Sequence, residues 1–248
     1  MSERGSDILA FTVTHGSRNK LKEFVPTIRA TAGCWFDWAV FLGDPTPDLK
    51  ETSEALLQDP QKRGIQYLYT WAENRGQHHA FAEALTIARA RGYKWLLRLD
   101  DDITPRRRKW LKLMVDRLED LRERKSDPYY RLIAAPRIVG LQNPLQHEGI
   151  LDVGQSYPVE IMTLLGGACR LHPVELLEDF VPDPLLPLGR GDPQAMAEYV
   201  EQSTGGFMVR FPDIKMRHPT IELEKAETPK EALRRRMGHY WCYLGPGV

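Results

Sequence analysis

The sequence contains few cysteines, and they lie far apart. Cys34, Cys169 and Cys242 are the only three in 248 residues, and none of them belongs to a Cys-x-x-Cys pair. An odd and widely spaced set argues against a disulfide framework and against a cysteine-rich zinc site. Because free thiols persist in reducing compartments, we expect a cytoplasmic protein.

Long apolar runs and an excess of charge of one sign are also missing. No stretch approaches the roughly 18 apolar residues of a membrane-spanning helix, so we expect no membrane span. The N-terminal residues MSERGSDILAFTV lack the basic segment and apolar stretch of a signal peptide. Lysine plus arginine and aspartate plus glutamate both number 34, so no overall field attracts nucleic acid or an anionic membrane.

The first part of the chain alternates predicted strands with predicted helices. Apolar, β-rich runs predict strands at residues 8–14, 36–44, 65–73, 93–102 and 131–141. Apolar residues at helical spacing predict helices at 20–33, which Pro26 would shorten or kink, and at 74–92 and 109–124. Between them, 45–64 is predicted to be an exposed loop with at most one helical turn. This alternation is typical of α/β proteins with a mostly parallel central sheet flanked by helices.

The rhythm changes after about residue 142, although no long linker separates the two parts. We therefore expect one domain over 1–248, with a nucleotide half at 8–141, an acceptor half at 142–220 and a basic, aromatic tail at 221–248. A helix is predicted from about Asp192, and a pair of strands within 207–223. Core positions are predicted for four tryptophans: Trp35, Trp38, Trp71 and Trp95.

Three consecutive aspartates follow the predicted strand that begins at residue 93. Adjacent carboxylates repel one another and raise one another's pKa unless a cation is present. Alternate side chains of a strand point the same way, so Asp100 and Asp102 would share one side and Asp101 the other. Mg²⁺ and Mn²⁺ are commonly bound by such carboxylates together with substrate phosphates. A solvated loop in which an aspartate caps the next helix is the alternative.

Polar clusters follow several of the predicted strands, namely HGSR, GDPTPD, ENRG and DDD. In open α/β sheets, ligands bind outside the carboxyl ends of the strands. The coincidence of four clusters at such ends predicts a binding site more strongly than any one of them does.

Seven short patterns occur in a characteristic order: FTVTHGSRN, VFLGDPTPD, ENRGQHHAFAEAL, LRLDDDITP, LLGGACRLHP, GRGDPQAMAEYV and PDIKMRHPT. With these, residues 8 to about 220 resemble the GT-A fold nucleotide-sugar glycosyltransferases of the inverting family 2. The sequence departs from the family pattern at Gly43 and Pro45, which flank Asp44, and at Gly191, where many members have an acid. The resemblance implies a Rossmann-like GT-A fold and metal-dependent transfer of a sugar, with inversion, from a nucleoside diphosphate, with UDP expected, to an acceptor hydroxyl.

The resemblance also implies roles for individual residues. Asp192 would take the proton from the acceptor hydroxyl, although an Asp-Pro pair also begins many helices. Asp102 and Asp100 would bind Mn²⁺ or Mg²⁺, and His218 would complete the metal side. Contacts with the nucleotide-sugar donor are assigned to Thr14, Arg18, Asp44, Arg75, Asp100 and Asp101.

Two basic clusters bear on the acceptor: Arg106, Arg107, Arg108 and Lys109, and then Arg234, Arg235 and Arg236. Such runs usually form solvated faces, but cations next to aromatic residues also suit phosphates and bases. A hydroxylated base in DNA is therefore one candidate acceptor. Two other functions remain open, a nucleotidyltransferase with the same aspartate pair and a nucleotide- and metal-binding module without turnover.

Overall fold

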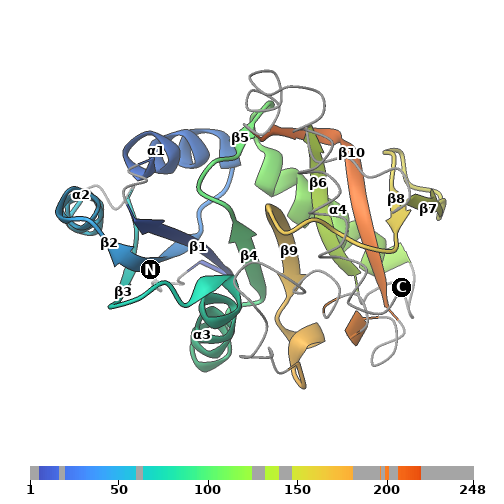
Figure 1. Cartoon of the computed structure of the whole chain (residues 1–248). Helices are drawn as coiled ribbons and strands as arrows, with labels where there is room; N and C mark the ends of the chain where they lie inside the picture. The colour runs from blue at the N-terminus through green and yellow to red at the C-terminus, as the bar shows by residue number, and fades with distance from the viewer. Residues whose placement is uncertain are drawn as a thin grey trace, which may run out of the picture.

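The structure, a computed structural model, describes residues 6–16, 20–59, 64–124, 132–139, 147–180, 196, 199–200 and 206–218. At its centre lies one ten-stranded sheet in the order β3-β2-β1-β4-β9-β6-β10-β8-β7, with β5 paired to β10. Figure 1 shows this sheet crossing the molecule, with helices packed along it. Among the described helices, none is long and apolar enough to cross a membrane.

One half of the sheet is parallel, as the strand and helix alternation predicts. Its strands are β1 (Ile8–Gly16), β2 (Asp37–Pro45), β3 (Tyr67–Trp71) and β4 (Trp95–Leu99). β1 pairs in parallel with both β2 and β4, and β2 pairs in parallel with β3. All five residues of β4 are buried, as expected for a strand covered on both faces.

The other half of the sheet is mixed. Its strands are β5 (Thr104–Pro105), β6 (Leu132–Val139), β7 (His147–Ile150), β8 (Glu160–Met162), β9 (Cys169–Pro173) and β10 (Phe207–Arg217). β9 is antiparallel to both β4 and β6, whereas β10 is parallel to β6 and antiparallel to β5 and β8. A strand of the predicted acceptor half therefore lies between two strands of the predicted nucleotide half.

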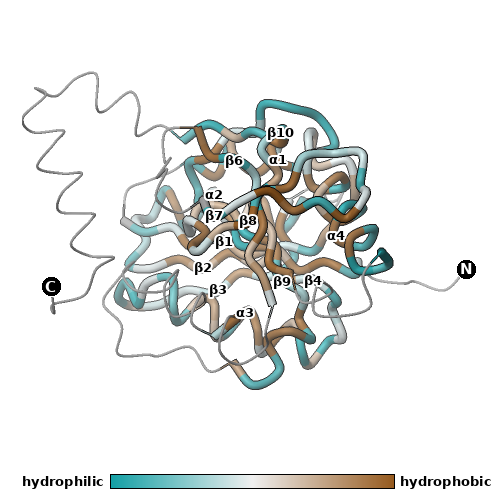
Figure 2. Tube along the Cα trace, turned by 90° about the vertical axis from the view of Figure 1, so that its right-hand side faces the viewer, coloured by the Kyte–Doolittle hydropathy of each residue, from teal (hydrophilic) through white to brown (hydrophobic). Residues whose placement is uncertain are grey.

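Helices cover both faces of the sheet, which confirms the predicted layering. The helices are α1 (Leu21–Ala32), α2 (Pro47–Leu57), α3 (Gly76–Arg91) and α4 (Trp110–Arg124), with a short 3-10 helix, η2 (Glu175–Leu177). α1, α2 and α4 share one core with Val40 and Leu42, whereas α3 and η2 share the other with Ala39 and Phe41. Figure 2 shows hydrophobic colours along the central strands and hydrophilic colours on peripheral loops.

The prediction of a loop at 45–64 is wrong, because α2 is an 11-residue helix. Thr46 is its N-cap, and the Thr46 hydroxyl accepts a hydrogen bond from the Leu49 amide at 3.4 Å. Pro47 follows in the first turn, where its fixed φ suits a helix and its missing N–H costs nothing. This start signal, together with the buried Leu49 and Ser53, prevails over a composition that is otherwise typical of turns.

Pro26 does not shorten the first helix, since α1 continues through it for 12 residues. Four apolar side chains near the proline are buried against the sheet: Leu21, Phe24, Val25 and Ile28. Burial of such a face provides most of the stability of a helix in a protein, and here it offsets the hydrogen bond that a proline cannot donate.

Two further predictions are wrong. Within the described part of 207–223 there is one 11-residue strand, β10, and not a strand pair. Its register against β6 shifts between Phe211 and Lys215, around a proline that cannot donate to a sheet. Trp35 is not a core residue but is 47% exposed, with the Arg29 guanidinium 4.5 Å from its ring centroid. The other three tryptophans are buried.

Candidate functional site

The carboxyl ends of the four parallel strands meet at one edge of the sheet, and several predicted site residues lie there. Thr14 is fully buried near the end of β1. Asp44 is exposed at the end of β2 and has a φ of 47°, in the left-handed region that aspartate tolerates better than most residues. Arg75 is exposed immediately before α3, and Asp100 immediately follows β4.

Asp100, Asp102 and His218 come together at this edge. Each offers one ligand atom, and the three atoms lie within 4.8 Å of one another. His218 Nε2 lies 3.4 Å from Asp102 Oδ1. Asp100 and Asp102 therefore face one site, as their spacing predicts, whereas Asp101 is buried with 8% exposure.

The sheet explains how His218 reaches the aspartates. After the aspartates, the chain forms β5, which pairs with the end of β10 through Met216 and Arg217. On the other side of β10, the His218 amide donates a hydrogen bond to the Val139 carbonyl at 3.2 Å. The end of β10 is thus held between two neighbours, and this fixes the histidine beside Asp102.

Burial raises the pKa of Asp100 to about 6, and the charges of Asp102 and Asp101 add to the effect. Arg98 opposes the shift, with its Nη2 atom 3.7 Å from Asp100 Oδ1. Gln77 Nε2 donates a hydrogen bond to the same oxygen at 3.1 Å. The carboxylate is therefore costly to ionise without a further positive charge, which a cation would supply.

Asp102 and His218 also have the properties of ligands. Asp102 Oδ1 is buried and receives no hydrogen bond in the described part of the chain. Burial lowers the pKa of His218, and Lys20 adds to this, although Asp102 and Asp101 oppose it. A histidine with a lowered pKa is neutral at pH 7, so one ring nitrogen carries a lone pair that can bind a metal.

Two carboxylates and an imidazole form a donor set that fits a divalent cation. Mg²⁺ and Mn²⁺ prefer oxygen ligands, and Mn²⁺ also accepts imidazole nitrogen. Two observations support this fit: Asp102 Oδ1 accepts no hydrogen bond from the described residues, and the pKa of Asp100 is raised.

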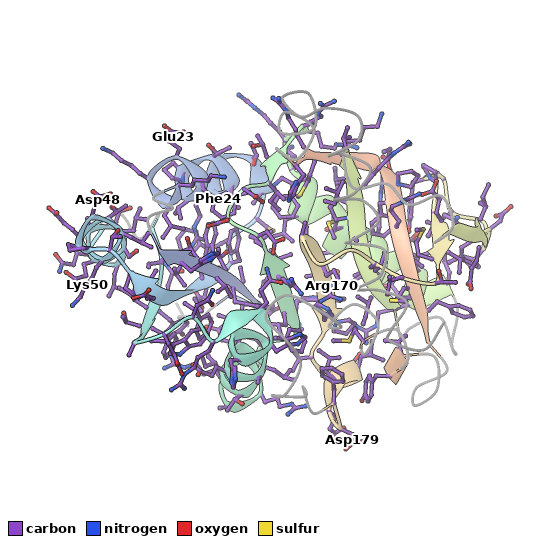
Figure 3. All side chains as sticks on the ribbon, in the orientation of Figure 1. Glu23, Phe24, Asp48, Lys50, Arg170 and Asp179 are labelled. Carbon is purple, nitrogen blue, oxygen red and sulfur yellow. The ribbon has the colours of Figure 1, made fainter. Side chains whose placement is uncertain are left out.

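The sequence patterns did not assign roles to Gln77, Arg98 and Arg170, which surround Asp100. Arg98 and Arg170 lie opposite each other on β4 and β9, and both are buried. Figure 3 labels Arg170 near the middle of the sheet. The signal for Arg98 was present in the sequence, as a single charge inside an otherwise apolar strand, because charged residues are almost never buried without a partner.

The other predicted residues include some that the structure does not describe. Arg18, Asp192 and the second basic cluster, Arg234, Arg235 and Arg236, lie outside the described residues. In the first basic cluster, Arg106, Arg108 and Lys109 are exposed, whereas Arg107 Nη1 lies 3.1 Å from Asp213 Oδ2. One of the four predicted acceptor-binding cations is therefore engaged within the protein.

The fold is similar to that of several solved glycosyltransferases. GalNAc-T7, solved with UDP, GalNAc and Mn²⁺, has a TM-score of 0.62 at 11% identity, over 85% of this chain and 42% of that chain. The mannosyltransferase PcManGT from Pyrobaculum calidifontis, in complex with GDP-Man and Mn²⁺, has a TM-score of 0.61 at 14% identity, over 87% and 57%. S. aureus TarS has a TM-score of 0.59 at 12% identity, over 85% and 36%.

The sequence itself matches no family profile and no curated protein. The structural similarity confirms the predicted GT-A fold. The chain spans between about a third and three fifths of the length of these proteins. At such identities the likeness establishes the fold, and the reaction has to be argued from the site.

Proposed function

We propose that the protein is a metal-dependent, inverting glycosyltransferase that moves a sugar from a nucleoside diphosphate, with UDP expected, to an acceptor hydroxyl. One observation carries the proposal: the ligand atoms of Asp100, Asp102 and His218 lie within 4.8 Å of one another where β4 and β10 end in a GT-A sheet. Two proteins of similar fold were solved with Mn²⁺, one with UDP and one with GDP-Man.

The proposed cation ligands are Asp100, Asp102 and His218. A divalent cation supplies Lewis acidity, which stabilises the negative charge that develops on the leaving diphosphate. The protein contributes two carboxylates and an imidazole whose ligand atoms lie close together. We assign contacts with the nucleoside and its phosphates to Thr14, Asp44, Arg75 and Asp101, which lie at the same edge of the sheet, and, on the sequence resemblance alone, to Arg18.

Asp192 is proposed as the general base on the sequence resemblance. It would accept the hydroxyl proton of the acceptor while the hydroxyl oxygen attacks the anomeric carbon. The bond between that carbon and the diphosphate oxygen breaks in the same displacement. Attack opposite the leaving group inverts the anomeric centre, and the nucleoside diphosphate departs with the electron pair.

For the acceptor, a hydroxylated base in DNA remains a candidate. Arg106, Arg108 and Lys109 are exposed and could neutralise phosphates, whereas Arg107 pairs with Asp213. Binding through phosphates weakens steeply with salt, by about one power of the salt concentration for each phosphate contacted. A steep loss of duplex binding with salt supports a DNA acceptor, and a flat response favours a small or lipid-linked acceptor.

Thermal shift with UDP, GDP, CDP and dTDP, each with and without Mn²⁺, tests the donor site. A ligand at 100 times its Kd stabilises the folded state by about 2.7 kcal/mol. For a chain of this size, about 2–4 °C per kcal/mol gives an expected rise in Tm of about 5–10 °C. We expect the rise to require both one nucleotide and Mn²⁺, and to disappear in Asp102→Asn.

The absence of any shift with all four nucleotides would overturn the proposed donor site. Once a binding nucleotide is identified, the protein is incubated with the matching nucleotide sugar and, separately, with the matching nucleoside triphosphate. The products then distinguish the remaining functions. Release of the nucleoside diphosphate indicates glycosyl transfer, and release of pyrophosphate from a nucleoside triphosphate indicates nucleotidyl transfer. Binding without either product indicates a module without turnover.

A further inference from the structure

Arg98 is a buried charge directly behind the proposed cation site. It lies one residue from the end of β4 and is 4% exposed. Its neighbours Leu97 and Leu99 pack in the core beneath α1, α2 and α4, so Arg98 projects from the opposite face, toward α3. A buried guanidinium requires partners, and the neighbours of Arg98 come from three separate segments of the chain, at Gln77, Asp100 and Gly167.

Gln77, in the first turn of α3, links Arg98 to Asp100. Arg98 Nη2 donates a hydrogen bond to Gln77 Oε1, and Gln77 Nε2 donates one to Asp100 Oδ1 at 3.1 Å. A guanidinium has only donors and a carboxylate only acceptors, so just one orientation of the Gln77 amide satisfies both. The side chain of Gln77 is thereby fixed, and it holds Asp100 Oδ1.

Gly167, just before β9, provides the surface on which the guanidinium rests. A Cβ atom at this position would lie 2.5 Å from Arg98 Nη2 and 2.8 Å from Arg98 Cζ. Such distances essentially never occur, so a side chain at residue 167 would displace the guanidinium. At Gly166, by contrast, an added Cβ would meet nothing within 4 Å.

The same segment also holds the backbone of the metal-side aspartate. The Asp100 amide donates a hydrogen bond to the Ala168 carbonyl at 2.9 Å. The contacts from Gln77 and Arg98 both fall on Oδ1 of Asp100, at 3.1 Å and 3.7 Å. Neither of these two contacts engages the second oxygen, Oδ2.

We infer that Gln77, Arg98 and Gly167 form a positioning unit that orients the Asp100 carboxylate for a divalent cation. The inference rests on the proposed function, since it concerns the same cation site. None of the three residues is assigned contact with substrate or metal. They act through Asp100, and Gly167 makes the affinity for the cation depend on a segment of the predicted acceptor half.

The test measures Mn²⁺ affinity and does not depend on turnover. Mn²⁺ is titrated into the full chain with saturating UDP, and free Mn²⁺ is followed by its EPR signal. The variants are Gln77→Leu, which removes both hydrogen bonds, and Gly167→Ala, which displaces the guanidinium. Gly166→Ala is the matched control, and Asp102→Asn reports whether the cation occupies the proposed site.

We expect Mn²⁺ to bind Gln77→Leu and Gly167→Ala about 10- to 100-fold more weakly than wild type, the usual effect of losing a residue that orients a metal ligand. Gly166→Ala should stay within about twofold of wild type. Because Gln77→Leu and Gly167→Ala both disturb the buried Arg98 guanidinium, their Tm without metal should fall. All affinities are therefore measured well below the metal-free Tm of each variant, which separates positioning from a general loss of structure.

Wild-type affinity in both Gln77→Leu and Gly167→Ala would overturn the positioning unit while leaving the proposed function intact. If wild type binds no Mn²⁺, or Asp102→Asn binds it equally well, the proposed cation site itself fails and the unit with it. If Gly167→Ala does not fold, Gln77→Leu decides, because Gln77 is only partly buried on a helix surface.

Discussion

Two sites along β10 contain aspartate, one at its register shift and one at its end, and the surroundings of the carboxylates differ. At the register shift of β10, Asp213 accepts two hydrogen bonds from Arg117, at 2.6 and 2.7 Å, and one from Arg107 at 3.1 Å. The Arg117 guanidinium is itself held over the rings of Tyr157 and Phe211. These partners lower the pKa of Asp213, with the hydrogen bond from Arg117 as the largest cause.

At the end of β10, the described residues do not fully satisfy the carboxylates of Asp100 and Asp102 beside His218. The pKa of Asp100 is raised to about 6, and no described residue donates a hydrogen bond to the buried Asp102 Oδ1. Aspartate occurs in both places, so the difference comes from the surroundings: hydrogen bonds from Arg117 lower the pKa of Asp213, whereas burial raises the pKa of Asp100 in spite of the nearby Arg98. Where arginine hydrogen bonds outweigh burial, the acid stabilises the fold, and where burial outweighs the nearby cations, the acid is suited to bind a ligand.

Asp102→Asn should have the largest effect, a loss of activity without a loss of stability. The substitution removes a proposed cation ligand, so we expect the kcat/KM for glycosyl transfer to fall by at least about 100-fold, the upper range for losing a residue that merely orients a ligand. Because it also relieves repulsion from Asp100, the Tm without metal should stay the same or rise. Steady-state kinetics and a melting curve measure the two effects. A fall in the metal-free Tm would place Asp102 among the structural acids.

His218→Ala should distinguish the two cations. Imidazole nitrogen is a better ligand for Mn²⁺ than for Mg²⁺, which strongly prefers oxygen. We expect the Kd for Mn²⁺ to rise by about 10-fold and the Kd for Mg²⁺ to change much less. Titration of each cation into the nucleotide-bound protein measures both values. Equal weakening of both would mean that His218 acts on the site only indirectly.

Asp213→Asn should have the opposite effect to Asp102→Asn, lowering stability but not Mn²⁺ affinity. It leaves the partly buried Arg117 with a neutral amide in place of a carboxylate, and we expect the free energy of unfolding to fall by about 1–2 kcal/mol. The affinity for Mn²⁺ should not change, because Asp213 is not in the cluster of Asp100, Asp102 and His218. Chemical denaturation and Mn²⁺ titration of the same sample give the two results. Loss of Mn²⁺ binding would show that the two clusters are coupled.

The contrast also explains which features could be predicted from sequence. The parallel strands β1 to β4 carry local patterns of apolar residues, and the aspartates after β4 are adjacent in the chain. By contrast, the partners of Asp213 and of Asp100 come from distant segments, Arg117 in α4 and Gln77 in α3. No repeating pattern of residues along the sequence indicates such pairs. His218 was assigned only through the family resemblance, because its proximity to Asp102 depends on how β5 pairs with β10.

The insertion of β9 between β4 and β6 could not be predicted for the same reason. Its pairing with both strands joins segments that are far apart in the chain, and either antiparallel or parallel pairing would fit its apolar residues. This insertion places Gly167 against Arg98. The aspartate ligands could therefore be predicted from the sequence, whereas the packing of the residues that orient them could not.

The lowered pKa of Asp213 predicts how the cluster responds to acid. A carboxylate with a folded-state pKa below its unfolded value stabilises the fold above the unfolded value, and this stabilisation is lost as the pH falls through the folded value. The difference in unfolding free energy between wild type and Asp213→Asn should thus be constant near neutrality. Below the ordinary aspartate pKa of roughly 3.9 it should shrink. A difference that grows on acidification would contradict the assignment.

The smallest expected effect separates the two arginines of the Asp213 cluster. Arg107 is 39% exposed and makes one contact with Asp213, whereas Arg117 is 11% exposed and makes two. Exposed ion pairs contribute about 0–1 kcal/mol, so Arg107→Ala should lower the free energy of unfolding by no more than about 0.5 kcal/mol. Arg117→Ala should cost clearly more, because it also removes the contacts with the Tyr157 and Phe211 rings. Denaturation of both variants measures the difference. Since Arg107 is then nearly dispensable for stability, a marked loss of acceptor binding in Arg107→Ala would assign it to the acceptor in spite of its pairing with Asp213.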